Sequence, residues 1–340
     1  MTDELYMTRC LELAKMAHGN CYPNPMVGSI IVHNGIIIGE GYHQKAGCGH
    51  AEINAINSVE NPALLPESTM YVTLEPCAHY GKTPPCAEKL AEIGFKKVVI
   101  GAMDSHEKVN GKGKQILENA GIEVKTGVLE TACREINKRF FTFHQKKRPY
   151  IILKWAQSAD GFMDQDYKPV QIGNELTKQF VHQLRCQEHA ILVGANTALH
   201  DNPSLTTREI EGRNPIRILI DPGLKVPDDF KIYNDEAPTL VLNTKTEAEV
   251  SGNKFLKVCK EHLLEDCMKI LHAQQIQSVL VEGGSFTLQN FINAGLWDEA
   301  YIIKNENLLL HNGTKAPVSQ AAPSETAVFR DNIIEYYKNT

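Results

Sequence analysis

Short apolar runs alternate with helical patterns twice along this chain, once before and once after a basic, proline-marked stretch, HQKKRPY, at residues 144–150. Such alternation is typical of α/β folds with largely buried sheets, because the helices cover the faces of the sheet. The 340 residues are too many for one ordinary core. We therefore predict two α/β domains, residues 1–146 and 147–340, which meet at this stretch because linkers are often polar and marked by proline.

The predicted elements of the first domain begin with an amphipathic helix near the N-terminus and a β-hairpin around Asn34–Gly35, a pair that favours tight turns. HAEINAINSV is then predicted to be a helix, TMYVTLEP a strand, CAEKLAEIG a helix that ends at Gly94, and KKVVIGAM a strand. In the second domain, strands are predicted at YIILKWA, AILVGA, IRILID, TLVLN and SVLVEGG. Asn174 is placed to cap a helix that begins at NELTKQF.

Composition narrows the class of protein. The sequence has no run of about 18 apolar residues, so we expect no membrane span. Its N-terminal segment mixes acids and bases without the apolar region of a signal peptide, and its nine cysteines are scattered, so we expect a cytoplasmic protein in a reducing compartment. The net charge of −6 argues against nucleic acid as the main partner but allows a small anionic substrate.

Four residues of the first domain have the types and the order of a catalytic zinc site. His50, Cys77 and Cys86 supply three ligands that zinc prefers, and a catalytic site keeps its fourth position for water. Glu52 lies two residues after His50, where a carboxylate can take a proton from water and pass it to a leaving amine. A lone histidine and two cysteines are more often core residues, but His-x-Glu followed by Pro-Cys and a second cysteine is the signature of zinc nucleobase deaminases.

The spacing of the two cysteines departs from that signature. Eight residues, AHYGKTPP, separate Cys77 from Cys86, where the signature has two. We expect this loop to form a specialised wall of the pocket. The segment TLEPC also predicts that Cys77 lies at a helix N-terminus, which favours the thiolate.

Four segments, YPNPMVGSIIV, GYHQKAG, HAE and TLEPCAHYGKTPPC, resemble the deaminase half of the bifunctional deaminase–reductases of riboflavin biosynthesis. The resemblance implies a cytidine-deaminase-like fold, one zinc ion, and a ribosylaminopyrimidine 5′-phosphate as substrate. It also implies a set of residues that line the substrate pocket, namely Asn24, His43, His79 and Lys82. The chain departs from the family at residues 104–107, DSHE, where members often carry DPNP.

The second domain lacks the G-x-G-x-x-G pattern of Rossmann domains and instead carries a strand, a turn at residues 282–285 (EGGS) and a helix. Glycines at a helix N-terminus allow backbone N–H groups to approach a phosphate. Three segments resemble the reductase half of the same family, namely this one, KWAQSADGFMD and GANTALHDNPSLTTR. The resemblance implies a dihydrofolate-reductase-like fold that uses NADPH. It also implies hydride transfer to the ribosyl group of the deaminated product.

The reductase resemblance implies two sets of contact residues. One set would contact NADPH: Gln157, Gln171, Gly173, Thr197, Asp201, Gly283, Gly284 and Ser285. The other would contact the substrate: Arg185, Leu205, Arg208 and Glu282. Ala159, Gln171 and Gly173 stand where the family has leucine, tryptophan and threonine, and the family's AP-x-L-L-G pattern is not evident near the C-terminus.

Two other classes of function fit part of these observations. One is a binding protein that keeps zinc only as a structural element, although Glu52 and an open fourth position disfavour it. The other is a deaminase of tRNA or of another nucleobase, fused to a degenerate second domain, which the acidic charge and the long loop between the cysteines disfavour. The sequence leaves a homo-oligomer open.

Overall fold

The computed structural model describes residues 2–80, 84–105 and 109–339. The chain divides into two compact units, Met1–Lys147 and Arg148–Thr340, which are described separately below. Three residues, 147–149, separate the end of helix α6 (Lys138–Lys146) from the start of strand β6 (Tyr150–Ser158), so the basic stretch contains a helix end and a strand start. In the part of the chain that is described, no helix has the length and apolar character to cross a membrane.

The first unit is built on a five-stranded sheet with the order β2-β1-β3-β4-β5. Strand β1 pairs antiparallel with both β2 and β3, whereas β3, β4 and β5 are parallel. The strands are β1 (Gly28–His33), β2 (Ile36–Tyr42), β3 (Thr69–Leu74), β4 (Lys97–Ala102) and β5 (Glu123–Thr126). The other elements are α1 (Asp3–Lys15), α2 (Ala51–Asn57), the 3₁₀-helix η1 (Pro62–Glu67), α3 (Cys86–Ile93), α4 (Lys112–Asn119) and α5 (Glu130–Ile136).

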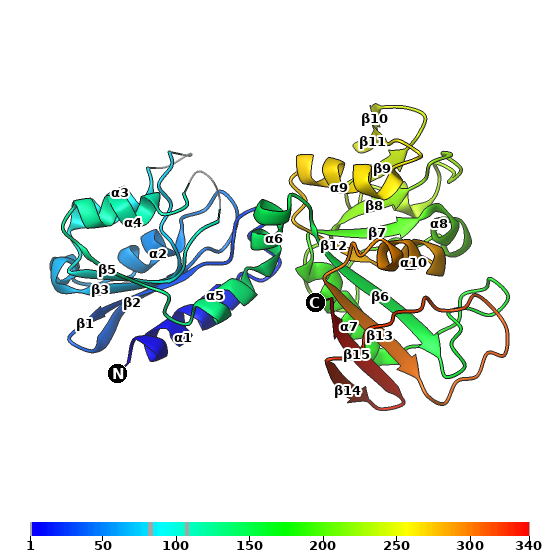
Figure 1. Cartoon of the computed structure of the whole chain (residues 1–340), viewed down its shortest axis with the longest axis horizontal. Coiled ribbons are helices and arrows are strands. Elements are labelled where there is room, and N and C mark those ends of the chain that lie inside the picture. Colours follow the sequence, from blue (N-terminus) through cyan, green and yellow to red (C-terminus); the bar gives the residue numbers. More distant parts are fainter. Residues whose placement is uncertain (1, 81–83, 106–108, 340) are drawn as a thin grey trace. The chain divides into compact units, whose positions relative to one another are not determined.

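Helices cover both faces of this sheet, as Figure 1 shows with α3 and α4 on one side and α1 and α5 on the other. Each face buries its own apolar cluster, which gives three layers. One cluster joins α1, α5 and α6 to the sheet through Met7, Cys133, Phe141, Ile30 and Val99. The other joins α2, α3 and α4 to the opposite face through Ala55, Leu90, Leu117, Ile31 and Ile100.

Two predicted turns of the first unit have the backbone that their residues favour. Asn34 (φ 49°) and Gly35 (φ 80°) both adopt the left-handed region between β1 and β2, as a two-residue hairpin turn requires. Gly94 ends α3 in the same region (φ 74°). The hairpin and the end of α3 are therefore confirmed.

The second unit is built on a ten-stranded sheet with the order β10-β11-β9-β8-β7-β12-β6-β13-β15-β14. Its strands are β6, β7 (Ala190–Gly194), β8 (Ile216–Ile220), β9 (Thr239–Asn243), β10 (Ala248–Val250), β11 (Asn253–Lys257), β12 (Ser278–Val281), β13 (Glu299–Asn305), β14 (Glu325–Phe329) and β15 (Asn332–Lys338). Its helices are α7 (Glu175–Gln187), α8 (Ala195–Asp201), the 3₁₀-helix η2 (Lys231–Tyr233), α9 (Leu263–Ala273) and α10 (Ser285–Asn293).

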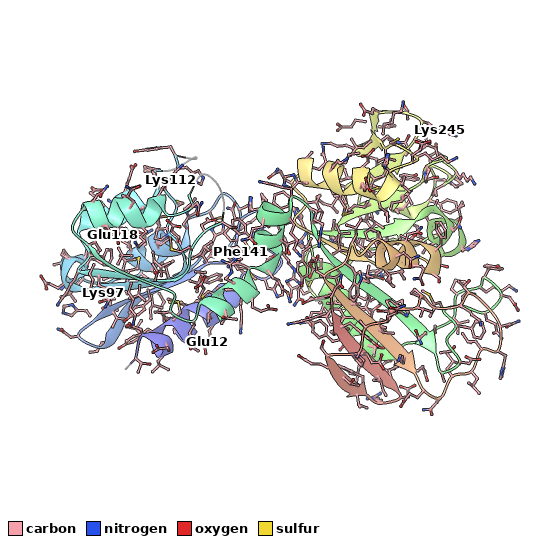
Figure 2. The ribbon with its side chains drawn as sticks, viewed as in Figure 1. Glu12, Lys97, Lys112, Glu118, Phe141 and Lys245 are labelled. Atoms are coloured by element: carbon pink, nitrogen blue, oxygen red, sulfur yellow. The ribbon has the colours of Figure 1, made fainter. Side chains whose placement is uncertain are left out.

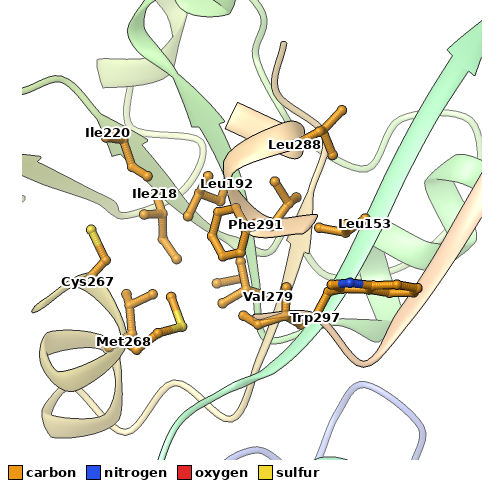
Figure 3. Close-up of a cluster of buried hydrophobic side chains, with 14 of the residues drawn as sticks. Leu153, Leu192, Ile218, Ile220, Cys267, Met268, Val279, Leu288, Phe291 and Trp297 are labelled. Atoms are coloured by element: carbon orange, nitrogen blue, oxygen red, sulfur yellow. The ribbon is translucent and has the colours of Figure 1, made fainter. Parts of the chain in front are cut away.

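Helices again cover both faces of the larger sheet. Figure 3 shows the cluster beneath α9 and α10, where Met268 and Phe291 pack against Leu192, Ile218 and Val279. Helices α7 and α8 cover the opposite face through Leu184 and Ala198. The five predicted strands are present as β6, β7, β8, β9 and β12, and the side chain of Asn174 accepts hydrogen bonds from the N–H groups of Leu176 and Thr177 at the start of α7.

Parallel strand pairing brings the segments that carry the predicted site residues to the same edge of each sheet. Strands β3 and β4 are parallel neighbours, so the loops that follow Leu74 and Ala102 leave the same edge of the first sheet. In the second unit β6, β7 and β12 are parallel neighbours, so the segments after Ser158, Gly194 and Val281 share one edge. Ligands of open α/β sheets bind at such carboxyl edges.

Candidate active sites

Three predicted metal ligands of the first unit lie together although they come from three segments. His50 is the N-cap residue of α2, Cys77 follows β3, and Cys86 begins α3. His50 Nδ1 is 3.2 Å from Cys86 Sγ and 3.5 Å from Cys77 Sγ, and the three donor atoms lie within 4.8 Å of one another. Tetrahedral zinc, with bonds of about 2.0 Å to nitrogen and about 2.3 Å to sulfur, places these atoms about 3.5 Å apart. The donor set therefore fits a zinc ion.

The two thiols are electrostatically unequal. Hydrogen bonding from Cys86, and from the ring of His50, lowers the pKa of Cys77 to about 4. The same interaction, together with burial, raises the pKa of Cys86. A metal that binds both sulfurs releases the proton that this pair otherwise keeps.

The prediction that Cys77 lies at a helix N-terminus is wrong. Cys77 lies in the loop after β3, and α3 begins only at Cys86, because the eight intervening residues include Pro84 and Pro85 directly before the helix. The helix still contributes to the thiolate, since the N–H of Cys86 donates to Cys77 Sγ over 3.2 Å.

Glu52 lies in the first turn of α2 and is only 3% exposed. Burial, and the negative charge of the neighbouring Cys77 thiolate, raise the pKa of Glu52. A raised pKa suits a carboxyl group that both accepts and returns a proton near neutral pH.

Of the four predicted pocket residues, His43 lies beside the ligand His50 and Asn24 contacts His43. Asn24 Nδ2 is 3.0 Å from His43 Nε2, and His43 Nδ1 is 3.1 Å from the carbonyl oxygen of Gly49. With Nδ1–H donating to that carbonyl, Nε2 accepts from Asn24, and burial lowers the pKa of His43, so the ring is neutral. The rings of His43 and His50 meet edge to face at 5.4 Å.

The other two predicted pocket residues belong to the loop between the cysteines. His79 is exposed, two residues after Cys77. Lys82 lies outside the described residues, as do His106 and Glu107 of the divergent segment.

In the second unit, Glu282 directly follows β12 and is held by two cations. Arg185 of α7 donates from Nε to Oε1 and from Nη2 to Oε2, each over 2.8 Å, and Lys154 Nζ of β6 lies 3.5 Å from Oε2. Burial alone would raise the pKa of Glu282, but the charges of Arg185 and Lys154 outweigh it and lower the pKa to about 2. Glu282 is therefore a buried carboxylate.

The segment after α8 carries two further predicted substrate residues, Leu205 and Arg208, on either side of Thr206, which Arg185 contacts. Arg185 Nη1 donates to the carbonyl oxygen of Thr206 over 3.2 Å, and Arg208 Nη1 lies 3.4 Å from Thr206 Oγ1. Leu205 has a left-handed backbone (φ 55°), and its side chain is buried in the core. Any contact of Leu205 with the substrate would therefore be made by its backbone.

Lys154 was missed in the sequence. It is the only charged residue of β6, in the run YIILKWAQS, and burial lowers its pKa. A lysine in the middle of an apolar strand is the signal that marks it, since lysines are almost never buried unless they are paired.

The predicted cofactor residues form a cradle at the carboxyl ends of β7 and β12. A Cβ atom on Gly283 would lie 2.5 Å from Val193 Cα, and one on Gly284 would lie 2.8 Å from Thr197 Oγ1. Helices α8 and α10 therefore begin beside each other, with glycine backbone between them, and Ser285 is the first residue of α10. Glycine backbone at paired helix starts fits the phosphates of a dinucleotide such as NADPH.

The remaining predicted cofactor residues are Gln157, Asp201, Gln171 and Gly173, and they are spread along the carboxyl edge of the second sheet. Gln157 is near the end of β6, where its Oε1 accepts from Trp155 Nε1 over 2.8 Å, and Asp201 is the last residue of α8. Gln171 and Gly173 flank Ile172, whose carbonyl accepts from Asn305 and Asn332 on the β13–β15 side of β6. Those two residues are thus separated from the glycine cradle by β6.

Comparison with known proteins matches both units. A family model described as the cytidine and deoxycytidylate deaminase zinc-binding region matches residues 1–102, and one described as the RibD C-terminal domain matches residues 149–310. The riboflavin biosynthesis protein RibD of Aquifex aeolicus is 41% identical over 307 residues, which cover 88% of this chain and 86% of that protein. The chain belongs to the RibD family.

Other RibD proteins extend the match over nearly the whole chain. The RibD protein of Escherichia coli is 37% identical and covers 91% of this chain, with 89% of its own length matched. The solved structure of a diaminohydroxyphosphoribosylaminopyrimidine deaminase/5-amino-6-(5-phosphoribosylamino)uracil reductase from Thermotoga maritima superposes with a TM-score of 0.90 at 34% identity, covering 98% of each chain. RibD of Acinetobacter baumannii superposes with a TM-score of 0.89 at 31% identity and covers 99% of this chain and 98% of its own.

Membership in the RibD family confirms several predictions. The family, the α/β fold of a deaminase followed by a reductase, the two enzymatic activities, and zinc and NADPH as cofactors are confirmed. The residue assignments within each site stay predictions.

Proposed function

We propose that the chain performs two successive steps of riboflavin biosynthesis. The first is hydrolytic deamination of 2,5-diamino-6-(ribosylamino)-4(3H)-pyrimidinone 5′-phosphate, and the second is NADPH-dependent reduction of the ribosyl group of the product to ribityl. The observation that carries this proposal is the convergence of His50, Cys77 and Cys86 next to the buried Glu52, in a chain whose other unit presents a glycine cradle.

In the deaminase site, His50, Cys77 and Cys86 would hold the zinc ion, which would supply the Lewis acidity that makes water a nucleophile near neutral pH. Glu52 takes a proton from the attacking water and passes it to the amine that leaves as ammonia. Asn24 and the neutral His43 present polar atoms to the pyrimidine. Burial of Glu52 keeps competing water away from the proton that it moves.

In the reductase site, bound NADPH would supply a hydride to C1′ of the ribosyl group, whose ring C1′–O bond opens to give the ribityl chain. Gly283, Gly284 and Ser285 would hold the cofactor phosphates on backbone N–H groups, with Thr197 beside Gly284. Arg208 supplies a cation for the 5′-phosphate of the substrate, because guanidinium groups pair with phosphate in a bidentate manner. Arg185 keeps Glu282 ionised and aimed, so that the carboxylate accepts hydrogen bonds from polar groups of the substrate.

The division of labour follows the two units. We assign the deaminase to residues 1–146 and the reductase to residues 147–340, and we expect a small-molecule substrate with no nucleic-acid partner because the net charge is −6. A cytoplasmic location rests on the nine scattered cysteines of the sequence.

A coupled assay with metal analysis tests the proposal. The purified chain should contain one zinc ion, should release ammonia from the phosphorylated ribosylaminopyrimidine without NADPH, and should then oxidise NADPH when it is added. Ammonia release from tRNA or free cytosine, with none from the ribosylaminopyrimidine, would favour a different deaminase. Stoichiometric zinc with no ammonia release from any of these compounds would favour a structural metal.

A further inference from the structure

The carboxylate of Glu75 collects three backbone N–H groups at the edge of the first sheet. Glu75 directly follows β3, two residues before Cys77, and is only 3% exposed. Its Oε2 accepts from the N–H of Gly111 over 3.0 Å and from that of Asp104 over 3.3 Å, while its Oε1 accepts from Lys114 over 3.1 Å. One side chain thus joins the end of β3 to the segments on either side of residues 106–108.

These donors belong largely to the start of α4. Gly111 is the N-cap residue of this helix and has no side chain with which to cap it, and Figure 2 marks Lys112 at its first turn and Glu118 near its end. The first N–H groups of a helix need acceptors, and a negative charge there is favoured by the helix dipole. Glu75 supplies both the acceptor oxygens and the negative charge, although it lies far from α4 in the sequence.

Helix α4 also packs closely against the backbone segment that precedes Cys77. A Cβ atom on Gly113 would lie 2.1 Å from the carbonyl oxygen of Pro76, so only glycine allows this approach. Beyond Pro76, the carbonyl of Cys77 accepts from the N–H of Ala87 over 3.1 Å, and Cys77 Sγ accepts from the N–H of Cys86. The segment Glu75–Cys77 is therefore fixed by α4 on one side and by α3 on the other.

We propose that Glu75 is a positioning residue for the deaminase: its carboxylate clamps α4 to the Glu75–Cys77 segment and so fixes the Cys77 sulfur relative to His50 and Cys86. This inference rests on the zinc deaminase function proposed above. Within the part of the chain that the structure describes, the carboxylate of Glu75 accepts from the backbone N–H groups of Asp104, Gly111 and Lys114, so it acts through the backbone that carries Cys77.

The chemistry of the clamp requires a carboxylate. Two oxygens with four lone-pair sites accept three N–H groups at once, whereas the amide of glutamine offers one oxygen and turns an NH₂ group toward a backbone donor. Glu75→Gln keeps the size of the side chain but leaves at least one of these N–H groups facing another donor. Residues that orient metal ligands typically change metal affinity or activity by about 10- to 100-fold when they are altered.

The test compares full-length, zinc-loaded Glu75→Gln with Glu92→Gln, which removes an exposed carboxylate from α3. We expect Glu75→Gln to release zinc to a chelator about 10- to 100-fold faster and to lose deaminase kcat by a similar factor, with KM changed less than about threefold. Reduction of the deaminated substrate, measured in the same sample, should be unchanged because that site lies in the other unit.

Two further variants keep the test decisive. Gly113→Ala drives α4 away from Pro76 and should also speed zinc release. Glu75→Asp keeps the charge but falls short of the donors, so its zinc release should lie between wild type and Glu75→Gln. If Glu75→Gln does not fold, wild-type zinc release in Glu75→Asp overturns the proposal.

Other outcomes separate this role from the function on which it rests. Zinc release and kcat equal to those of Glu92→Gln would overturn the role of Glu75, as would a rise in KM alone. Failure of the wild-type chain to hold zinc or to deaminate would instead refute the proposed function.

Discussion

Arg185 and Glu282 form a buried, two-pronged ion pair, with both nitrogen–oxygen distances at 2.8 Å and with side chains that are 12% and 7% exposed. Because the pair joins α7 to the end of β12, it links an element that covers the sheet to the segment that enters the glycine cradle. Ion pairs of this geometry are strong when intact and costly when one partner is removed.

The first prediction concerns acid stability. The pKa of Glu282 is about 2 in the folded chain, against an ordinary value of 4.5. The pair therefore contributes stability above about pH 4.5 that is lost as the pH falls toward 2, to a limit of about 3 kcal/mol. Urea unfolding at pH 5 and pH 3, followed by tryptophan fluorescence, measures this unit alone because Trp155 and Trp297 both lie in it.

Glu282→Gln is the comparison for this measurement. It should be less stable at pH 5 by about 3 kcal/mol, because Arg185 and Lys154 lose their buried counter-charge. Its stability should also fall less between pH 5 and pH 3. Equal pH dependence in the two proteins would contradict the lowered pKa of Glu282.

The second prediction concerns the metal. Cys77→Ala should remove most of the zinc, because it deletes one of three donors that converge within 4.8 Å. Elemental analysis of the purified protein measures this directly. Cys48→Ala, at an exposed cysteine of the same unit, should retain the metal. Full zinc in Cys77→Ala would refute the ligand assignment.

The third prediction concerns proton transfer. Glu52→Gln should keep zinc and fold but lose at least about 10²-fold in deaminase kcat, because the amide cannot shuttle a proton. Steady-state ammonia release measures the loss, and Glu60→Gln, at an exposed glutamate just beyond α2, provides the control. Near-normal turnover in Glu52→Gln would mean that another group moves the proton.

The fourth prediction concerns the glycine cradle. Gly283→Ala places a methyl group 2.5 Å from Val193 Cα, so β7 and the start of α10 must separate, and we expect KM for NADPH to rise at least about tenfold. Gly223→Ala is a matched control in the same unit, since the atoms nearest to its added Cβ belong to the flexible side chain of Lys225. Deaminase turnover should be normal in both. An unchanged KM for NADPH in Gly283→Ala would place the cofactor elsewhere.

The fifth prediction concerns separability. Each unit has its own sheet and its own buried clusters, so a fragment of residues 1–146 should bind zinc and deaminate without NADPH. A fragment that starts at Arg148 should reduce the deaminated compound, because Arg148 pairs with Asp298 inside the second unit. A folded second fragment that consumes no NADPH would refute the reductase assignment, and fragments that fail to fold would refute the two-domain prediction.

Local patterns predicted much of the fold and the metal site. Asn34–Gly35, Gly94 and Asn174 act on neighbouring backbone, so their roles are legible in sequence, and all three are confirmed. Strands β10, β11 and β13–β15 were not predicted; they extend both ends of the larger sheet, and β13 joins it by parallel pairing with β6, which lies far earlier in the chain.

Relationships carried by backbone atoms were beyond sequence reasoning. Glu75 accepts hydrogen bonds from donors 29, 36 and 39 residues away. Those donors are backbone N–H groups, which every residue except proline carries, so the residue types do not reveal them. Cys77 was misplaced because the loop before Cys86 delays the helix. Lys154 became significant only when β12 placed Glu282 beside it.

The capped start of α4 has a consequence for inhibitor design. An unfilled helix N-terminus would attract the acidic tail of a substrate mimic. Here Glu75 already satisfies the N–H groups of Gly111 and Lys114, so a phosphonate aimed at this helix meets a negative charge instead of donors. Compounds against the deaminase should direct their acidic group toward side-chain cations and leave α4 alone.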